Sequence, residues 1–104
     1  MSKMITRRKN MRISLDIEAH YKYGGEWQKC QLFDLSIEGA GLRVHQSFVR
    51  GDNIILRLIH NKEEIILNTT ILNTYGTRIG IKFNEITDSH QNFINKMMST
   101  LRKY

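Results

Sequence analysis

The chain has 104 residues, enough for one compact domain with a single hydrophobic core and too few for two. Sixteen Lys and Arg against ten Asp and Glu give a formal net charge of +6, which favours an acidic partner: a nucleotide, a nucleic acid, an anionic membrane surface or an acidic protein patch. The single cysteine excludes an internal disulfide framework, and no apolar run has the length of a membrane span. Because the first eleven residues also lack the apolar core of a secretory signal, we expect a cytoplasmic protein without membrane insertion.

A basic cluster lies near the amino end, at Arg7, Arg8, Lys9 and Arg12, with no carboxylate among the first fifteen residues. A guanidinium is planar and permanently charged, and its fork of donors suits phosphate oxygens or the O6/N7 edge of guanine. The simpler interpretation of such a stretch alone is a solvated basic tail. Since a regular alternation begins directly after it, we predict that residues 1–12 form a flexible lead-in to a domain that spans residues 13–104.

Apolar residues occupy every second position from Ile13 to Tyr23, with polar residues between them. This period of two predicts a strand with one buried face. Gly24 and Gly25 follow, and two residues that accept positive φ predict a tight hairpin.

Residues 26–33 are predicted to return as the partner strand. Either Trp27 and Phe33, or Cys30 and Leu32 on the other face, would point into the core. The pattern does not choose between them, and apolar residues on both faces also allow a β-bulge. Cys30 is most simply a small buried hydrophobe.

Residues 34–41 are predicted to turn sharply, because Gly39 and Gly41 let the backbone bend and come close to a ligand. Asp34 and Ser36 would then lie at the end of the preceding strand. Short apolar runs with turn residues between them continue from there to about residue 83, and such spacing favours a closed or nearly closed antiparallel barrel of about six strands. The further strands are expected at 42–44, 54–59, 64–73 and 78–83, with hairpin turns at 61–62 and 75–76.

The hydrophobic period changes near the carboxyl end and predicts one amphipathic helix over about 88–103. Asp88 is a natural N-cap, and Gln91 could complete a capping box. The apolar face is expected to cover an open part of the barrel, and docking on a second subunit or partner is the alternative. This face comprises Phe93, Ile94, Met97, Met98 and Leu101.

Catalytic and metal-binding patterns are not found in the sequence. The four histidines are dispersed, no two His or Cys have metal-ligand spacing, and neither a nucleophile elbow nor a phosphate-binding glycine loop is present. We therefore predict a binding protein without a metal or cofactor rather than an enzyme.

Two short motifs stand in order along the chain, Arg8-x-x-x-Arg12 and Asp34-x-Ser36-x-x-Gly39. Together they resemble the motifs of the PilZ family, and the resemblance extends from about residue 6 to the end. It implies an all-β-dominated fold, a six-stranded antiparallel β-barrel of the split-barrel type with a C-terminal helix. It also implies a function, that of a bacterial receptor for the second messenger cyclic di-GMP.

The resemblance also implies a role for each motif residue. Arg8 and Arg12 would hold phosphate and the Hoogsteen edge of guanine, and would stack on the bases. Asp34 would accept hydrogen bonds from N–H groups on the other edge of guanine. Ser36 would add a hydroxyl contact, and Gly39 would let the backbone approach the ligand.

Arg7 extends the basic cluster by one residue and could stack on a second ligand, so we expect two cyclic di-GMP molecules per chain; a spare surface arginine is the alternative. Ligand binding is expected to order residues 1–12, and the new surface would be recognised by an unidentified downstream protein.

A small basic barrel that binds single-stranded RNA or DNA is the alternative function, because such barrels combine cationic grooves with stacking aromatics. The candidate aromatics are Tyr21, Tyr23, Trp27 and Tyr75, which we predict to lie mainly in the core or at the barrel rim. Nucleic acid is therefore the less favoured partner.

Overall fold

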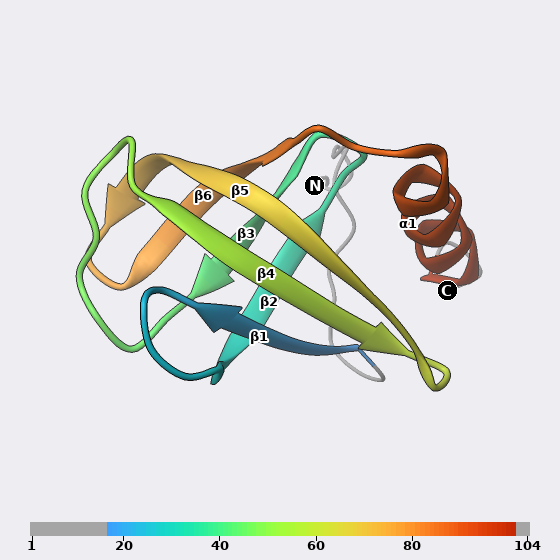
Figure 1. The fold of residues 1–104 in the computed structure, drawn as a ribbon, viewed down its shortest axis with the longest axis horizontal. Helices are drawn as coiled ribbons and strands as arrows, with labels where there is room; N and C mark the ends of the chain where they lie inside the picture. Colours follow the sequence, from blue (N-terminus) through green and yellow to red (C-terminus); the bar gives the residue numbers. More distant parts are fainter. Residues whose placement is uncertain (1–16, 102–104) are drawn as a thin grey trace, which may run out of the picture.

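A computed structural model describes residues 17–101, so predictions for residues 1–16 and 102–104 lie outside the described part of the chain. Six strands precede one helix (Figure 1). The strands are β1 (Glu18–Lys22), β2 (Gln28–Leu35), β3 (Gly39–Arg43), β4 (Asn53–His60), β5 (Glu63–Tyr75) and β6 (Arg78–Asn84), and the helix is α1 (Asp88–Leu101).

The strands form a closed barrel in the order β1-β2-β3-β6-β5-β4, and every neighbouring pair is antiparallel. The pairing of β1 with β4 closes the barrel. Closure leaves the six described strands without an unpaired sheet edge on which another chain could add a strand. The predicted six-stranded antiparallel barrel with a C-terminal helix is confirmed.

The core fills the interior of the barrel, because inward positions alternate with outward ones along each strand. In β4, for example, Ile54, Leu56 and Leu58 are at most 2% exposed, while Ile55 and Ile59 at the alternate positions are half-buried on the outside. The largest fully buried side chains are Tyr21, Leu35, Leu42, Ile54, Leu56, Leu58, Leu67, Ile71, Ile94 and Met97.

The undecided face of β2 is settled by a bulge. Cys30 and Leu32 point into the core, and the register shifts between Leu32 and Asp34. Phe33 is the extra residue, so it lies outside the barrel, and Leu35 returns to the interior. Both faces of this segment carry apolar residues because the bulge moves the inward positions by one residue.

The four candidate aromatics are predicted to lie mainly in the core or at the barrel rim, and the structure places only Tyr21 in the core. Tyr21 is fully buried, but Tyr23 is 47% exposed and Tyr75 is 85% exposed. Trp27 is half-buried outside the barrel, with the Arg57 guanidinium carbon 4.4 Å from its ring centroid. The reason is that β1 ends at Lys22 and β2 begins at Gln28, so Tyr23 and Trp27 belong to a loop in which strand alternation no longer applies.

Two predicted turns also differ from the structure. The connection from β1 to β2 takes residues 23–27 rather than a tight Gly-Gly turn, and only Gly24 of the two glycines has positive φ, at 79°. The predicted turn at 34–41 is shorter, since β3 already begins at Gly39. By contrast, the predicted tip at Asn61 and Lys62 is confirmed, because both residues have the positive φ that a two-residue hairpin requires.

The cap of α1 is Thr87, not the predicted Asp88. The backbone N–H of His90 donates to Thr87 Oγ1 at 3.2 Å, and the backbone N–H of Thr87 donates to His90 Nδ1 at 3.2 Å. This reciprocal pair is a capping box in which histidine takes the place usually held by glutamate or glutamine, so Gln91 does not complete the box as predicted.

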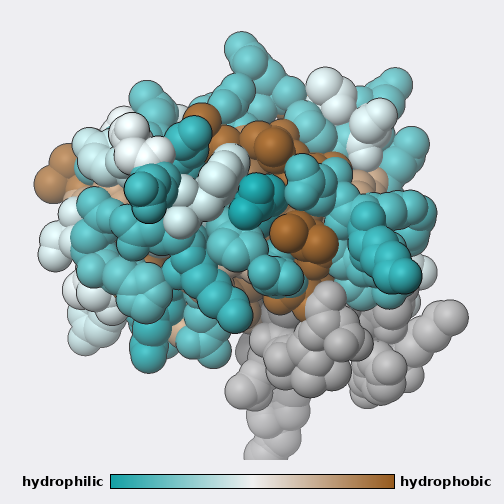
Figure 2. Space-filling view, turned by 60° about the horizontal axis from the view of Figure 1, so that its bottom comes forward, coloured by the Kyte–Doolittle hydropathy of each residue, from teal (hydrophilic) through white to brown (hydrophobic). Residues whose placement is uncertain are grey.

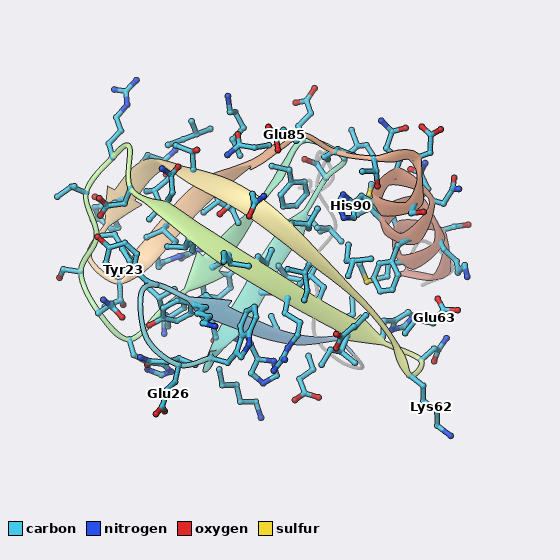
Figure 3. All side chains as sticks on the ribbon, in the orientation of Figure 1. Tyr23, Glu26, Lys62, Glu63, Glu85 and His90 are labelled. Atoms are coloured by element: carbon cyan, nitrogen blue, oxygen red, sulfur yellow. The ribbon has the colours of Figure 1, made fainter. Side chains whose placement is uncertain are left out.

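The helix packs Phe93, Ile94 and Met97 of its predicted apolar face into the same core as the barrel. Phe93, Ile94 and Met97 are at most 8% exposed and belong to the continuous buried cluster. An ion pair between Lys96 and Glu63, with 3.4 Å between Nζ and Oε1, also links α1 to the start of β5, where Glu63 lies on the side of the helix (Figure 3).

On the face drawn in Figure 2, hydrophilic residues predominate and hydrophobic residues form a smaller patch near the middle. Within residues 17–101, no helix is both long and apolar enough to cross a membrane.

Candidate functional site

The candidate site lies on the outer face of the barrel, where β2, β3, β6 and β5 run side by side. The first bulge, in β2, is one of its borders. Leu32 pairs with Leu42 on β3, but Asp34, two residues further on, pairs with Gly41. Phe33 and Asp34 therefore both lie outside the barrel, and Asp34 leans over the neighbouring strand.

A second bulge, in β5, is the opposite border. Ile71 pairs with Ile81 on β6, whereas Asn73 pairs with Gly80, so Leu72 is the extra residue. Leu72 is 44% exposed and Asn73 is exposed. Each bulge thus places one apolar and one polar side chain in succession on the outer face.

Two paired glycines form the floor between the bulges. Gly41 lies directly opposite Gly80 in the pairing of β3 with β6. A Cβ on Gly41 would lie 3.0 Å from Asp34 Oδ1, and a Cβ on Gly80 would lie 2.7 Å from Asn73 Oδ1. The carboxylate and the carboxamide therefore reach over a floor that carries no side chain of its own.

Both of these polar groups are available to a ligand as far as the described residues are concerned. Among residues 17–101, no side chain donates a hydrogen bond to the Asp34 carboxylate and none pairs with the Asn73 carboxamide. An ionised carboxylate can only accept hydrogen bonds, whereas a carboxamide can donate and accept. Above the glycine floor, the Asp34 carboxylate can accept hydrogen bonds from a ligand, and the Asn73 carboxamide can both donate and accept them.

Ser36 closes the turn that follows β2. Its Oγ accepts hydrogen bonds from the backbone N–H groups of Glu38 and Gly39, each at 3.2 Å, and lies 3.3 Å from the Gly39 carbonyl oxygen, to which it donates. The backbone N–H of Ser36 donates to the same carbonyl at 2.9 Å. Ser36 therefore fixes the conformation of the turn beside Asp34.

Gly39 is held against β6. It pairs with Lys82, and a Cβ at this position would overlap the carbonyl oxygen of Ile81. The preceding residue is also fixed, because the backbone N–H of Phe83 donates to the Glu38 carbonyl oxygen at 2.8 Å. The packing of the two strands is by itself sufficient reason for a glycine here.

An open depression of about 580 Å³ extends from Gly80, one of the two floor glycines, towards this turn. Its size is within the range of small-molecule sites, and its lining combines polar and apolar groups. The lining includes Asp34, Ser36, Gly39, Leu72, Lys82 and Ile86.

Cationic side chains surround the site on the outer face. The guanidinium carbons of Arg78 and Arg43 lie 4.2 Å and 5.3 Å from the centroid of the Phe33 ring, and Lys82 is exposed on the rim of the depression. Within the described residues, none of the three cations has a carboxylate within 4.0 Å. A negatively charged ligand would therefore meet cations that are not already neutralised.

The structure brings together three of the six predicted site residues, Asp34, Ser36 and Gly39; Arg7, Arg8 and Arg12 lie outside the described residues. Gly41 was also identified from the sequence, but Asn73, Gly80 and the pairing of Gly41 with Gly80 were not. A signal was present, since a glycine inside a strand pattern often marks close approach of a backbone or a ligand. The register that joins these residues could not be read without the fold.

No group of three or more His, Cys, Asp or Glu side chains among the described residues could hold a metal ion. The single cysteine, Cys30, points into the core, where burial raises the pKa of its thiol to about 12. A thiol that stays protonated at neutral pH is a poor nucleophile.

Comparisons with known proteins agree on one family. The model of the PilZ domain matches residues 6–99. No curated protein matches the chain. Among solved structures, the PilZ domain with c-di-GMP of YcgR from Escherichia coli is similar with a TM-score of 0.75 at 11% identity, covering 94% of this chain and 93% of that one.

Two further structures have the same fold. The PilZ domain of CeSA from a cellulose-synthesizing bacterium has a TM-score of 0.67 at 18% identity, with 88% of this chain and 97% of that chain covered. MrkH of K. pneumonia in its apo state has a TM-score of 0.74 at 16% identity, and the match covers 97% of this chain and 53% of MrkH. The identities are low, but the family model spans nearly the whole sequence, and the chain therefore belongs to the PilZ domain family.

Proposed function

We propose that this chain is a receptor for cyclic di-GMP. The observation that carries the proposal is the arrangement of Asp34, Ser36 and Gly39 along one open depression, with cations nearby that have no carboxylate partner among the described residues. The similar E. coli structure is a PilZ domain with c-di-GMP, which supports the same ligand class for this chain.

The chemistry of the site suits a guanine nucleotide. Asp34 accepts hydrogen bonds, and the ring N–H and amino group of guanine are adjacent donors that a carboxylate can bind together. The depression beside Asp34 is open to the outer face and has the size of a small-molecule site. The phosphodiester groups of the ligand each carry one negative charge, which the surrounding cations would stabilise.

Arg8 and Arg12 belong to the proposal as the residues that hold phosphate and the Hoogsteen edge of guanine. In this mechanism, ligand binding orders residues 1–12 over the outer face of the barrel, and a downstream protein recognises the resulting surface. Arg7 would stack on a second cyclic di-GMP molecule. The protein acts in the cytoplasm and has no catalytic step.

Isothermal titration of the whole chain with cyclic di-GMP tests this function. We expect saturable binding that Asp34→Ala and Arg12→Ala weaken at least about tenfold, which corresponds to about 1.4 kcal/mol. Glu26→Ala is the matched control, because it removes one exposed carboxylate from the β1–β2 loop. An excess of GTP should not displace the ligand.

Salt dependence separates this function from binding to single-stranded nucleic acid. A ligand with two phosphates should show a shallow dependence of affinity on salt, with a slope of about 1 to 2, whereas a polynucleotide should show a steep one. No heat with cyclic di-GMP, together with binding of a short RNA that weakens steeply with salt, would refute the receptor and establish the nucleic-acid alternative.

A further inference from the structure

The barrel consists of two three-stranded halves with the same arrangement. Strands β1, β2 and β3 pair in succession, as do β4, β5 and β6, and the halves join through β3 with β6 and through β1 with β4. Because all pairs are antiparallel, a local twofold axis passes between the halves and exchanges β1 with β4, β2 with β5, and β3 with β6.

The registers show that this symmetry holds residue by residue around the site. In the first half, the bulge takes the pairing from Leu32↔Leu42 to Asp34↔Gly41. In the second half, it takes the pairing from Ile71↔Ile81 to Asn73↔Gly80. Every residue in the second set stands 39 positions after its counterpart in the first, and the two bulges are therefore equivalent.

The axis crosses the barrel at two places. On one side it passes between Gly41 and Gly80, which face each other in the pairing of β3 with β6. On the other side it passes between Tyr21 and Leu56, paired in β1 and β4. The glycine floor thus lies on the symmetry axis of the barrel.

This symmetry carries the Asp34-x-Ser36-x-x-Gly39 motif onto Asn73-x-Tyr75-x-x-Arg78. The turns correspond as well. In the second half, Tyr75 pairs with Arg78 at the base of the β5–β6 hairpin. In the first half, the equivalent residues Ser36 and Gly39 are joined by a hydrogen bond of 2.9 Å from the Ser36 N–H to the Gly39 carbonyl oxygen. The second half therefore places three side chains around the glycine floor at positions equivalent to those of the motif.

These three side chains have the chemistry to bind a nucleotide. The Asn73 carboxamide lies over Gly80 and can both donate to and accept from a base edge. Tyr75 is 85% exposed, which leaves its ring free to stack on a base. Arg78 lies with its guanidinium carbon 4.2 Å from the Phe33 ring centroid and has no carboxylate partner among the described residues, so it can contact a phosphate.

We infer that Asn73, Tyr75 and Arg78 form a second guanylate-binding half-site, related to the first by the twofold axis. The inference rests on the proposed function, because cyclic di-GMP consists of two identical guanylate units that are themselves related by a twofold axis. The guanylate unit bound here belongs either to the same cyclic dinucleotide, which then lies across the glycine floor, or to a second molecule.

Titration of cyclic di-GMP into variants of the whole chain tests the half-site. Tyr75→Ala is the most informative variant, since the exposed ring contributes little to the fold, and Asn73→Ala and Arg78→Gln complete the set. Each should weaken overall binding about fivefold or more, or remove one of two binding events. Matched controls are Asn68→Ala on the same strand and Arg50→Gln in the β3–β4 connection, both exposed and away from the axis, which should change affinity less than twofold.

Stoichiometry distinguishes the source of the guanylate unit. If one cyclic di-GMP binds per chain and all three variants weaken it, the two guanylate units of that single ligand lie on opposite sides of the axis. If two molecules bind per chain and Tyr75→Ala reduces the stoichiometry to one, a second cyclic di-GMP molecule occupies the half-site. Wild-type affinity and stoichiometry in all three variants would overturn the half-site while leaving the receptor function intact.

Titration with 5′-GMP provides a readout that does not require cyclic di-GMP binding. Backbone amide shifts of Asn73, Tyr75 and Arg78 that saturate with 5′-GMP, and that Tyr75→Ala weakens, support the half-site even if the proposed function fails. Absence of saturable shifts at these residues, in a chain that also does not bind cyclic di-GMP, would overturn both proposals.

Discussion

Replacing Gly39 with alanine should destabilise the barrel more than any other single methyl group added at the site. The new Cβ would overlap the carbonyl oxygen of Ile81, which belongs to the backbone of β6 and cannot rotate away. Relief requires β3 and β6 to separate locally, which weakens the 2.8 Å bond from the Phe83 N–H to the Glu38 carbonyl. Forced packing costs about 1–3 kcal/mol, and a weakened backbone hydrogen bond costs about 1 kcal/mol. We therefore expect a loss of roughly 2–4 kcal/mol, seen by circular dichroism as a Tm lower by roughly 10–20 °C.

Gly41→Ala is the control for this reasoning. A Cβ there would meet only atoms of the Asp34 side chain, at 3.0–3.2 Å, and a side chain can rotate aside. The Tm should therefore change by only about a few degrees, while cyclic di-GMP binding weakens because the carboxylate is displaced. A Gly39→Ala protein with wild-type Tm that no longer binds ligand would refute the argument, because it would show that this glycine makes room for the ligand and not for β6.

Four further outcomes follow from the structure. Ser36→Ala removes the hydroxyl that holds residues 36–39 in their turn. Urea titrations should show a free energy of unfolding lower by about 1–2 kcal/mol. Ser36→Thr keeps a hydroxyl at this position and should cause a smaller loss. Thr87→Ala removes the cap of α1 and should cost about 1 kcal/mol, whereas Thr87→Ser should cost much less. Thr69→Val removes the buried hydroxyl that donates to the Ile54 carbonyl at 2.9 Å, and a loss of about 1–2 kcal/mol is expected; an unchanged urea midpoint would contradict it. Burial raises the pKa of Cys30 from 9.0 to about 12, so between these pH values the folded state retains a proton that the unfolded state loses. The free energy of unfolding should therefore fall as pH rises from 9 towards 12. The fall should be steeper in wild type than in Cys30→Ala, which has no thiol to titrate.

Much of the barrel could be predicted from the sequence because its strands are regular. Alternation of apolar and polar residues located β4 and β6 to within about one residue, and the Asn61-Lys62 tip followed from the turn chemistry. The pattern was insufficient where the backbone departs from a period of two. The β2 bulge put Phe33 outside the barrel, and the loop at 23–27 exposed Tyr23, although both residues continue an apolar pattern.

The candidate site was predictable only in part. Asp34, Ser36 and Gly39 stand close together in the sequence, so their motif was visible, and the fold places them together. Asn73 and Gly80 join the site through a register between β3, β6 and β5 that no local pattern specifies. The equivalence of the two halves was equally hidden, because the matching stretches share a geometry and few residue types.

The glycine floor has a consequence for how the protein can change over evolution. Leu42, Ile79 and Ile81 alternate with the two floor glycines along β3 and β6, and these three residues are at most 3% exposed. The residues that stabilise the barrel and the proposed ligand-binding residues therefore lie on opposite faces of the same two strands, separated by the pleat of the sheet. Outward positions such as Arg43, Arg78 and Lys82 can vary, and the ligand preference can diverge with them, while the interior that keeps the barrel folded stays unchanged.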